Sequence, residues 1–181
     1  MGALAKVVVP ERQDARGMPR FCERCGTTLF QLAVEAGMLG ACGHCGHTIF
    51  HTPTVVAVTV LADATRADHI WLIRRGIDPF RGSWALPGGY VDADEHPRDA
   101  ARRECAEEML CEVRIGSLLG VHHARFNGHD GVVVIAYAGT AVGVPRPGAE
   151  VLEVCSFPLS RRPPLAFDTH EAALAQWQPL S

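Results

Sequence analysis

Most of the chain after residue 54 is built from short apolar runs of the length expected for strands. Val55 to Leu61 is rich in β-branched residues, which is typical of a buried strand, and residues 69–74 alternate as expected for its hairpin partner. Further runs of this kind predict three more strands, at residues 113–121, 132–138 and 151–157. Strands therefore outnumber helices in the predicted pattern.

Two segments have helical character. The first begins at Pro97, because proline suits the first helical turn, and Asp99 then lies at the positive end of the helix dipole. This helix extends to about Leu110, after a loop rich in glycine and proline at residues 76–89. The second helix is short and spans residues 169–177.

The first 50 residues have a different composition. Residues 1–20 mix charged residues with glycine and proline and show no periodicity, so we predict a flexible tail. Residues 21–51 contain four cysteines and little else that could form a hydrophobic core. We therefore divide the chain into the tail, a small cysteine-bearing module at 21–51 and a main domain at 52–181.

Composition and charge exclude several classes of protein. The 181 residues are 48% hydrophobic and 20% charged, with a net charge of -3, unlike a disordered polyanion or a basic nucleic-acid coat. No window approaches the roughly 18 apolar residues of a membrane helix, and the apolar run near the N-terminus is too short for a signal peptide. We therefore expect a cytoplasmic protein with no membrane partner.

Four of the seven cysteines form two CxxC pairs, Cys22 with Cys25 and Cys42 with Cys45. Sixteen residues separate the pairs, a spacing that suits one tetrahedral zinc ion. Four thiolates leave no open position on the ion, so this Zn²⁺ would be structural and would supply folding free energy. A disulfide or redox pair is the alternative. Nearby histidines are alternative ligands: His44, His47 and His51.

The cysteine-bearing module carries few positive charges. Arg24 is its only lysine or arginine between Phe21 and His51. Binding to a phosphate backbone needs clustered cations, so this composition argues against nucleic acid as a partner.

Three glutamates lie close together on the first predicted helix. Glu104, Glu107 and Glu108 are spaced i, i+3 and i+4, which places their carboxylates on one face. These like charges repel one another near the negative end of the helix dipole. Mg²⁺ or Mn²⁺ would neutralise them, since such cations bridge carboxylates to substrate phosphates. The alternative is a solvated acidic face, with Arg103 paired to Glu107.

The segment from Gly89 to Cys111 resembles the Nudix hydrolase box, GX5EX7REUXEEXGU, in which U is a bulky aliphatic residue. Matching residues occupy six positions in order and spacing: Gly89, Glu95, Arg103, Glu104, Glu107 and Glu108. Cys105 and Cys111 stand at the aliphatic positions, where a buried cysteine behaves as a small hydrophobe. Leu110 replaces the glycine that normally closes the helix, which bears on the end of the helix more than on the metal site.

The resemblance extends to a subgroup of the family that carries a zinc ribbon before the Nudix domain. Residues 79–84 are similar to its PYRGKW loop, and residues 166–174 to its tail segment that begins with Ala-Phe. The signature of the NADH pyrophosphatases is absent from residues 118–125. Some members of the subgroup hydrolyse FAD or ADP-ribose.

This resemblance implies an α+β protein with the Nudix fold, a mixed β-sheet sandwiched by helices, preceded by a small zinc ribbon. The implied reaction is Mg²⁺-dependent hydrolysis of the pyrophosphate bond in a nucleoside diphosphate linked to another moiety, such as FAD, ADP-ribose or an NADH-like dinucleotide. Arg103 would orient the glutamates, with Glu95 as its ion-pair partner. The implied magnesium ligands are Glu104, Glu107, Glu108 and the carbonyl of Gly89.

Residues outside the box complete the implied site. Glu150, or Glu153 as a second candidate, would act as base or metal ligand; the alternative is a solvated loop glutamate. Substrate phosphate would contact Arg75 and Arg81, which are otherwise surface arginines, and Phe80 would stack on the substrate's ring. The competing function is a non-catalytic module that senses nucleotides or binds through its ribbon. The resemblance also implies a possible homodimer.

Overall fold

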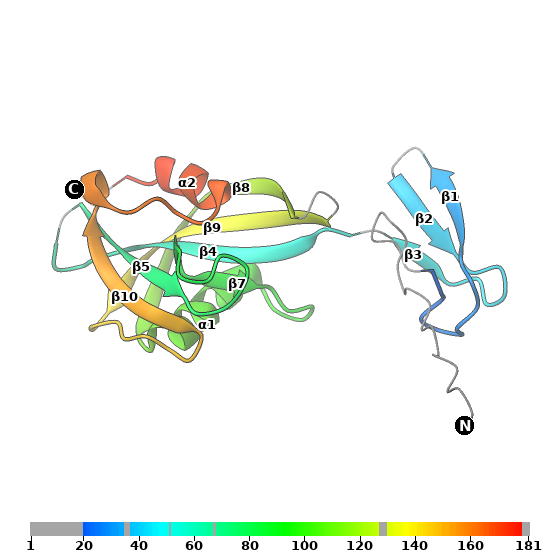
Figure 1. Ribbon diagram of the computed structural model, residues 1–181, viewed down its shortest axis with the longest axis horizontal. Coiled ribbons are helices and arrows are strands. Elements are labelled where there is room, and N and C mark those ends of the chain that lie inside the picture. The colour runs from blue at the N-terminus through cyan, green and yellow to red at the C-terminus, as the bar shows by residue number, and fades with distance from the viewer. Residues whose placement is uncertain (1–19, 35–36, 51, 67, 127–129, 179–181) are drawn as a thin grey trace, which may run out of the picture. The chain divides into compact units, whose positions relative to one another are not determined.

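The computed structural model describes residues 20–34, 37–50, 52–66, 68–126 and 130–178 (Figure 1). The chain divides into two compact units, with the boundary between Pro53 and Thr54. The flexible tail predicted at residues 1–20 lies almost wholly outside the described residues. None of the described helices is long and apolar enough to cross a membrane.

The N-terminal unit contains a three-stranded antiparallel sheet that the sequence analysis did not foresee. Its strands are β1 (Phe30–Val34), β2 (Gly37–Ala41) and β3 (Thr48–Phe50), in that order. The run of β-branched residues that marks β4 is absent here, so no strand was predicted. Among the side chains that the structure describes in this unit, Cys22, Leu29 and Cys42 form a small core, with Cys45 packed against it.

The second unit is built on a seven-stranded mixed sheet, and all five strands predicted for it are confirmed. Its main path runs β10–β5–β4–β9–β8. The bounds are β4 (Thr54–Ala62), β5 (His69–Arg75), β8 (Glu112–Phe126), β9 (Asp130–Val142) and β10 (Val151–Pro158). The predicted hairpin is β4 with β5, and β4 pairs in parallel with β9 on its other side.

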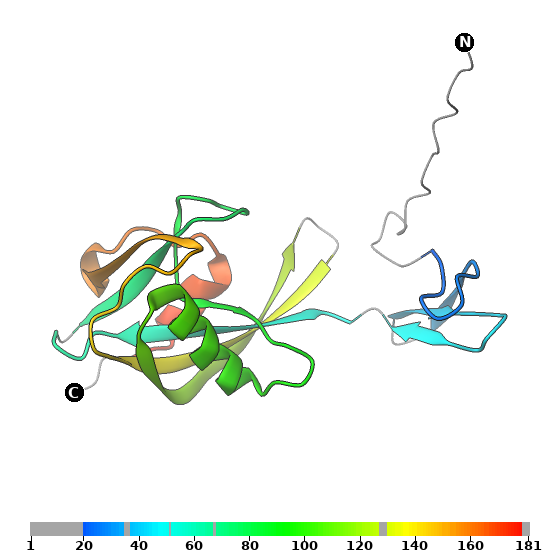
Figure 2. The same ribbon diagram turned by 90° about the horizontal axis from the view of Figure 1, so that it is seen from below.

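Helices cover both faces of this sheet (Figures 1 and 2). They are α1 (Pro97–Met109) and α2 (Asp168–Ala175), and a short 3-10 helix, η1 (Leu159–Arg161), follows β10. Side chains of β4 alternate between the two layers: Val60 packs in the core that contains Leu174 of α2, and Leu61 in the core that contains Met109 of α1. The predicted mixed sheet sandwiched by helices is therefore confirmed.

The loop predicted at residues 76–89 contains two short strands. β6 (Trp84–Ala85) pairs with β5, and β7 (Gly88–Tyr90) pairs with β4. Gly88 has a φ of 147°, and a Cβ atom there would lie 2.2 Å from the carbonyl oxygen of Ala57. The glycines that suggested an irregular loop thus allow this backbone to approach β4 closely.

The end of α1 adopts a backbone conformation that leucine rarely takes. Leu110 has a φ of 45° and a ψ of 38°, in the left-handed region where many helices end at glycine. The helix therefore terminates as the box glycine would terminate it, although the glycine is missing. The Leu110 side chain is 61% exposed, so it gains little packing in return.

We expect Leu110→Gly to raise the free energy of unfolding by about 1 kcal/mol, because glycine has no Cβ to crowd the left-handed backbone. Urea denaturation followed by circular dichroism measures this change. The control is Leu118→Gly, since Leu118 is also exposed but lies in β8, where glycine weakens a strand. A loss of stability in Leu110→Gly would contradict the expectation.

Candidate active site and zinc centre

Helix α1 carries the acidic residues, and its ends are where the sequence predicted. It begins at Pro97, and the Nδ1 atom of His96 accepts a hydrogen bond from the N–H of Arg98 at 3.1 Å. One face of the helix is buried against the sheet through Ala100, Ala101, Cys105 and Met109. Burial raises the pKa of Cys105 to about 12, as expected of a packed and unreactive thiol.

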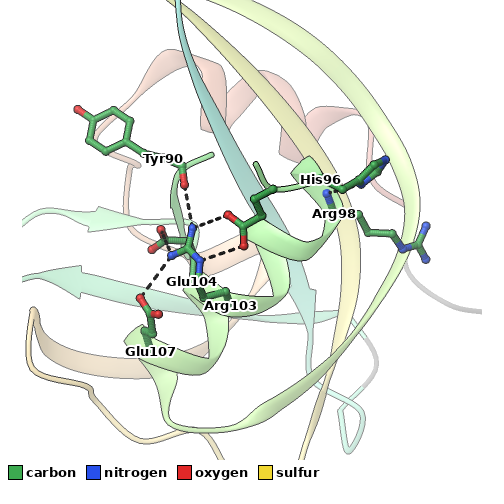
Figure 3. Close-up of polar contacts among 7 residues, drawn as sticks. Tyr90, His96, Arg98, Arg103, Glu104 and Glu107 are labelled. Atoms are coloured by element: carbon green, nitrogen blue, oxygen red, sulfur yellow. Dashed lines mark hydrogen bonds and ion pairs between the residues drawn. The ribbon is translucent and has the colours of Figure 1, made fainter. Parts of the chain in front are cut away.

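Arg103 connects the acidic residues of the box to one another (Figure 3). Its Nε and Nη2 atoms donate to the two carboxylate oxygens of Glu95 at 3.0 and 2.8 Å. Its Nη1 atom donates to Glu104 at 2.8 Å and to Glu107 at 3.5 Å. Nη2 also donates to the carbonyl of Tyr90 at 3.0 Å. The predicted pairing of Arg103 with Glu95 is therefore present, and it is bidentate.

These ion pairs and the degree of burial affect the carboxyl groups differently. The hydrogen bonds from Arg103 hold the pKa of Glu95 below its usual value. Glu104 is only 16% exposed, and burial raises its pKa although Arg103 opposes the rise. Glu107, by contrast, is 62% exposed. Arg103 thus neutralises part of the charge on this face of α1, but it does not fully offset the effect of burial on the pKa of Glu104.

Gly89 lies directly against Glu104. A Cβ atom at Gly89 would be 2.5 Å from the carboxyl carbon of Glu104 and 2.6 Å from each of its oxygens. Any larger residue would therefore displace this carboxylate. The contact also brings the backbone of Gly89 beside Glu104, as expected if both belong to one metal site.

Glu108 is the most strongly perturbed carboxyl group of the helix. Its Oε2 atom accepts a hydrogen bond from the N–H of Gly88 at 2.8 Å. Burial, with contributions from the charges of Glu104 and Glu150, raises its pKa to about 8, although Gly88 and Arg75 oppose this. A buried carboxylate in such surroundings is stabilised by a nearby cation.

The donor set suits a divalent cation bound through oxygen. Glu104, Glu107 and Glu108 offer hard carboxylate ligands on one helix face, and two of them lack full access to water. In the described residues, the four cysteines form the one group whose ligand atoms all lie within 4.8 Å of one another. The α1 carboxylates are not gathered to that degree, and two of them are hydrogen-bonded to Arg103 instead.

The predicted substrate-binding residues lie in and beside the segment between β5 and β6. Arg75 donates from Nε to the carbonyl of Pro79 at 2.8 Å, and Arg81 donates to the carbonyl of Gly76. Phe80 is 50% exposed and has a φ of 61°, which is unusual for a bulky residue. Such strain is often found at functional sites. The segment therefore presents an aromatic ring flanked by two anchored arginines.

Two residues that the sequence analysis did not single out as functional support this segment. The ring of Phe167 meets that of Phe80 edge to face at 5.3 Å, and the Arg75 guanidinium lies 5.2 Å from the Phe167 ring centre. His170 is 6% exposed and accepts the N–H of Leu86 on Nδ1 at 3.1 Å. Burial and the charge of Arg75 lower the pKa of His170 to about 3, so it remains a neutral acceptor near neutral pH.

The two candidate glutamates beyond the box have different surroundings. Glu150 is exposed and immediately precedes β10, and its negative charge contributes to the raised pKa of Glu108. Its backbone carbonyl accepts the N–H of Gly76 at 2.8 Å. Glu153 instead pairs with Arg74 at 3.6 Å, where β10 lies beside β5. Glu153 is thus engaged in an ion pair, whereas the charge of Glu150 acts on Glu108.

The four cysteines of the N-terminal unit converge on one point. The Sγ atoms of Cys22 and Cys45 are 3.6 Å apart, those of Cys25 and Cys42 are 3.4 Å apart, and all four lie within 4.8 Å of one another. Sulfurs at about 2.3 Å from one tetrahedral ion would be roughly 3.8 Å apart, so the cluster fits zinc.

Each CxxC pair sits on a tight turn of the same kind. Gly26 donates to the carbonyl of Cys22 at 2.8 Å, and Gly46 donates to that of Cys42 at 2.9 Å. Both glycines have a positive φ, of 72° and 70° respectively, which only glycine adopts readily. His47 is hydrogen-bonded to Glu23 at 3.0 Å and is not part of the cluster; His51 lies outside the described residues.

Comparison with known proteins matches residues 51–178 to the NUDIX domain. An ADP-ribose pyrophosphatase of Methanocaldococcus jannaschii is 34% identical over 123 residues, which are 67% of this chain and 72% of that protein. A NUDIX hydrolase structure from Nitrosomonas europaea aligns with a TM-score of 0.74 and 26% identity, over 86% of this chain and 88% of the other. The MutT NUDIX hydrolase structure from Burkholderia pseudomallei gives 0.63 and 27%, over 70% and 99%.

The domain match, the fold and the contacts within the box agree. The matched region contains the whole mixed sheet with both helices and every residue of the box. The chain therefore belongs to the Nudix hydrolase family and is a hydrolase of acid anhydride bonds.

Proposed function

We propose that the protein hydrolyses the pyrophosphate bond of ADP-ribose. The observation that carries this proposal is the contact network of the box, in which Arg103 joins Glu95 to Glu104 beside the half-buried Glu108. The choice of ADP-ribose among nucleotide-derived substrates is supported by the similarity to the pyrophosphatase of M. jannaschii. FAD and NADH-like dinucleotides share the same bond and are the nearest alternatives.

Glu104, Glu107 and Glu108 would hold Mg²⁺ or Mn²⁺, with the carbonyl of Gly89 as a further ligand. A divalent ion in this position supplies a Lewis acid that neutralises the pyrophosphate charge and acidifies water. Arg103 would keep the Glu104 carboxylate in place, because its guanidinium is itself fixed by a bidentate pair with Glu95. Because Gly89 has no side chain, the Glu104 carboxylate can approach the backbone of β7.

Glu150 would act as the base. Its carboxylate would take a proton from the attacking water, while the bond between one phosphorus and the bridging oxygen breaks. The products are AMP and ribose 5-phosphate. Its exposed side chain and its electrostatic influence on Glu108 support this role.

The segment between β5 and β6 would bind the rest of the substrate. Arg75 and Arg81 each donate one hydrogen bond to a backbone carbonyl, which orients the guanidinium group. Each guanidinium has further N–H donors that could bind phosphate. Phe80 offers a half-exposed ring for stacking on adenine, and its edge-to-face contact with Phe167 restrains it.

A substrate panel tests this function. The purified protein, incubated with Mg²⁺, should release AMP from ADP-ribose with a higher kcat/KM than from FAD, NADH or ATP, as measured by chromatography. Omission of the metal should abolish release, because the pyrophosphate charge is then not neutralised. A preference for ATP, or no AMP from any compound, would contradict the proposal.

The same panel separates the enzyme from a nucleotide-sensing module. A sensor would bind ADP-ribose in calorimetry and leave it intact. The three helix carboxylates favour the enzyme, because a binding site for an anionic nucleotide gains nothing from three negative charges without a metal.

A further inference from the structure

A loop from a distant part of the chain closes the C-terminal end of α1. The N–H of Arg146 donates to the carbonyl of Met109 at 2.7 Å, and the N–H of Gly148 donates to the carbonyl of Glu108 at 2.8 Å. The last carbonyls of a helix have no partner within the helix and must find one elsewhere. Residues 145–150, which we call the clamp loop, provide these donors.

Gly148 makes this close approach possible. A Cβ atom at Gly148 would lie 2.0 Å from the carbonyl oxygen of Glu107 and 3.2 Å from that of Glu108. Both neighbours are backbone atoms, which cannot rotate away as a side chain can. Pro145 and Pro147 flank the contact and restrict the backbone around it. The last turn of α1 and the clamp loop therefore meet at a position that admits only glycine.

The clamp loop is also held on its other side. The carbonyl of Glu150 accepts the N–H of Gly76, and a Cβ atom at Gly76 would lie 2.6 Å from that same oxygen. The carbonyl of Gly76 in turn accepts a hydrogen bond from Arg81. Hydrogen bonds to backbone carbonyls thus link three parts of the site: the last turn of α1, the backbone of Glu150 and the segment that carries Phe80.

We propose that the clamp loop fixes Glu150 relative to the carboxylates of α1. Gly148 is the positioning residue that sets the distance between Glu150 and those carboxylates. The inference rests on the proposed function, because Glu150 is the group that would react. It adds a residue that touches neither substrate nor metal. Gly148 lies against the backbone of Glu107 and Glu108, and this contact sets the position of Glu150, two residues further along the chain.

Kinetics of Gly148→Ala test the proposal. We expect kcat for ADP-ribose to fall by about 10-fold to 100-fold, because a displacement of about 1 Å in a reacting group has effects of this size. KM should stay within about 2-fold, since the substrate-binding segment keeps the contacts that do not involve the clamp loop, Arg75 with Pro79 and Phe80 with Phe167. Arg146→Ala is the matched control: it removes an exposed side chain, leaves the N–H that bonds Met109, and should retain the wild-type kcat.

A double variant distinguishes positioning from general loosening. Gly148→Ala acts through Glu150, so adding it to Glu150→Gln should lower kcat no further than Glu150→Gln alone. If the two losses multiply, or if Gly148→Ala folds and keeps the wild-type kcat, the proposal is wrong.

Amide hydrogen exchange on the wild-type protein tests the clamp without reference to activity. The amides of Arg146 and Gly148 should exchange at least about 10-fold more slowly than exposed loop amides, because both are bonded to α1. Rapid exchange at both amides would overturn the clamp, whatever the enzyme hydrolyses. Protected amides in a protein that does not cleave ADP-ribose would instead refute the proposed function and support the clamp.

Discussion

Glu108→Gln should lower kcat for ADP-ribose by about 100-fold or more, equivalent to at least ~2.7 kcal/mol of transition-state stabilisation. Glutamine has the same shape, and its amide oxygen can still accept the N–H of Gly88, so the local structure should persist. What the substitution removes is a negative charge from the proposed metal site. Because Glu108 is half-buried and burial disfavours its charged form, losing that charge should leave the melting temperature unchanged or raise it.

The control for this experiment is Glu112→Gln, which removes a charge from an exposed glutamate at the start of β8. It should keep the wild-type kcat. Titration with Mn²⁺ gives a second readout, since Glu108→Gln should bind the metal more weakly and Glu112→Gln should not. Full turnover in a folded Glu108→Gln protein would show that Glu108 is not a metal ligand.

Cys42→Ser should remove zinc from the protein and unfold the N-terminal unit. The wild-type chain should contain about one zinc ion by elemental analysis, and the variant none. Zinc binding supplies roughly 10 kcal/mol or more of folding free energy in such sites. Among the side chains that the structure describes in this unit, the buried core contains one aliphatic residue, Leu29, beside the cysteines. Amide exchange should therefore lose its protection in β1, β2 and β3.

Cys155→Ser is the matched control, because Cys155 lies in β10 of the second unit and is not a member of the cysteine cluster. It should retain both the zinc and the protected strands. A wild-type protein that is free of zinc but keeps an ordered N-terminal unit would contradict the zinc assignment of all four cysteines.

Local signals in the sequence were sufficient for the main elements of the second unit. The β-branched run at residues 55–61 and Pro97 at the start of a helix specify structure through nearby residues alone, and both were predicted correctly. Strand β7 was not predicted, because Gly88 and Gly89 disfavour a strand by propensity. Its pairing depends on the close approach to Ala57, which is a tertiary contact.

The candidate site likewise combines features that nearby residues predict with features that depend on tertiary contacts. The shared helix face of the glutamates could be predicted from their spacing. The pairing of Arg103 with Glu95 could be predicted from the resemblance to the Nudix box. His170 could not, because its partner Leu86 is 84 positions away. One signal was available: His170 lies three and four residues before Ala173 and Leu174, which are buried on the same helix face.

The ion pairs of Arg103 imply that the two proposed metal centres depend on their ions in different ways. Arg103 gives Glu104 and Glu107 a counter-charge from within the chain, so this part of α1 is electrostatically tolerable before any metal arrives. The four thiols of Cys22, Cys25, Cys42 and Cys45 have no comparable arginine or lysine among their described contacts. We therefore expect zinc to be required for folding of the N-terminal unit, whereas the catalytic ion would bind to a site that is already formed.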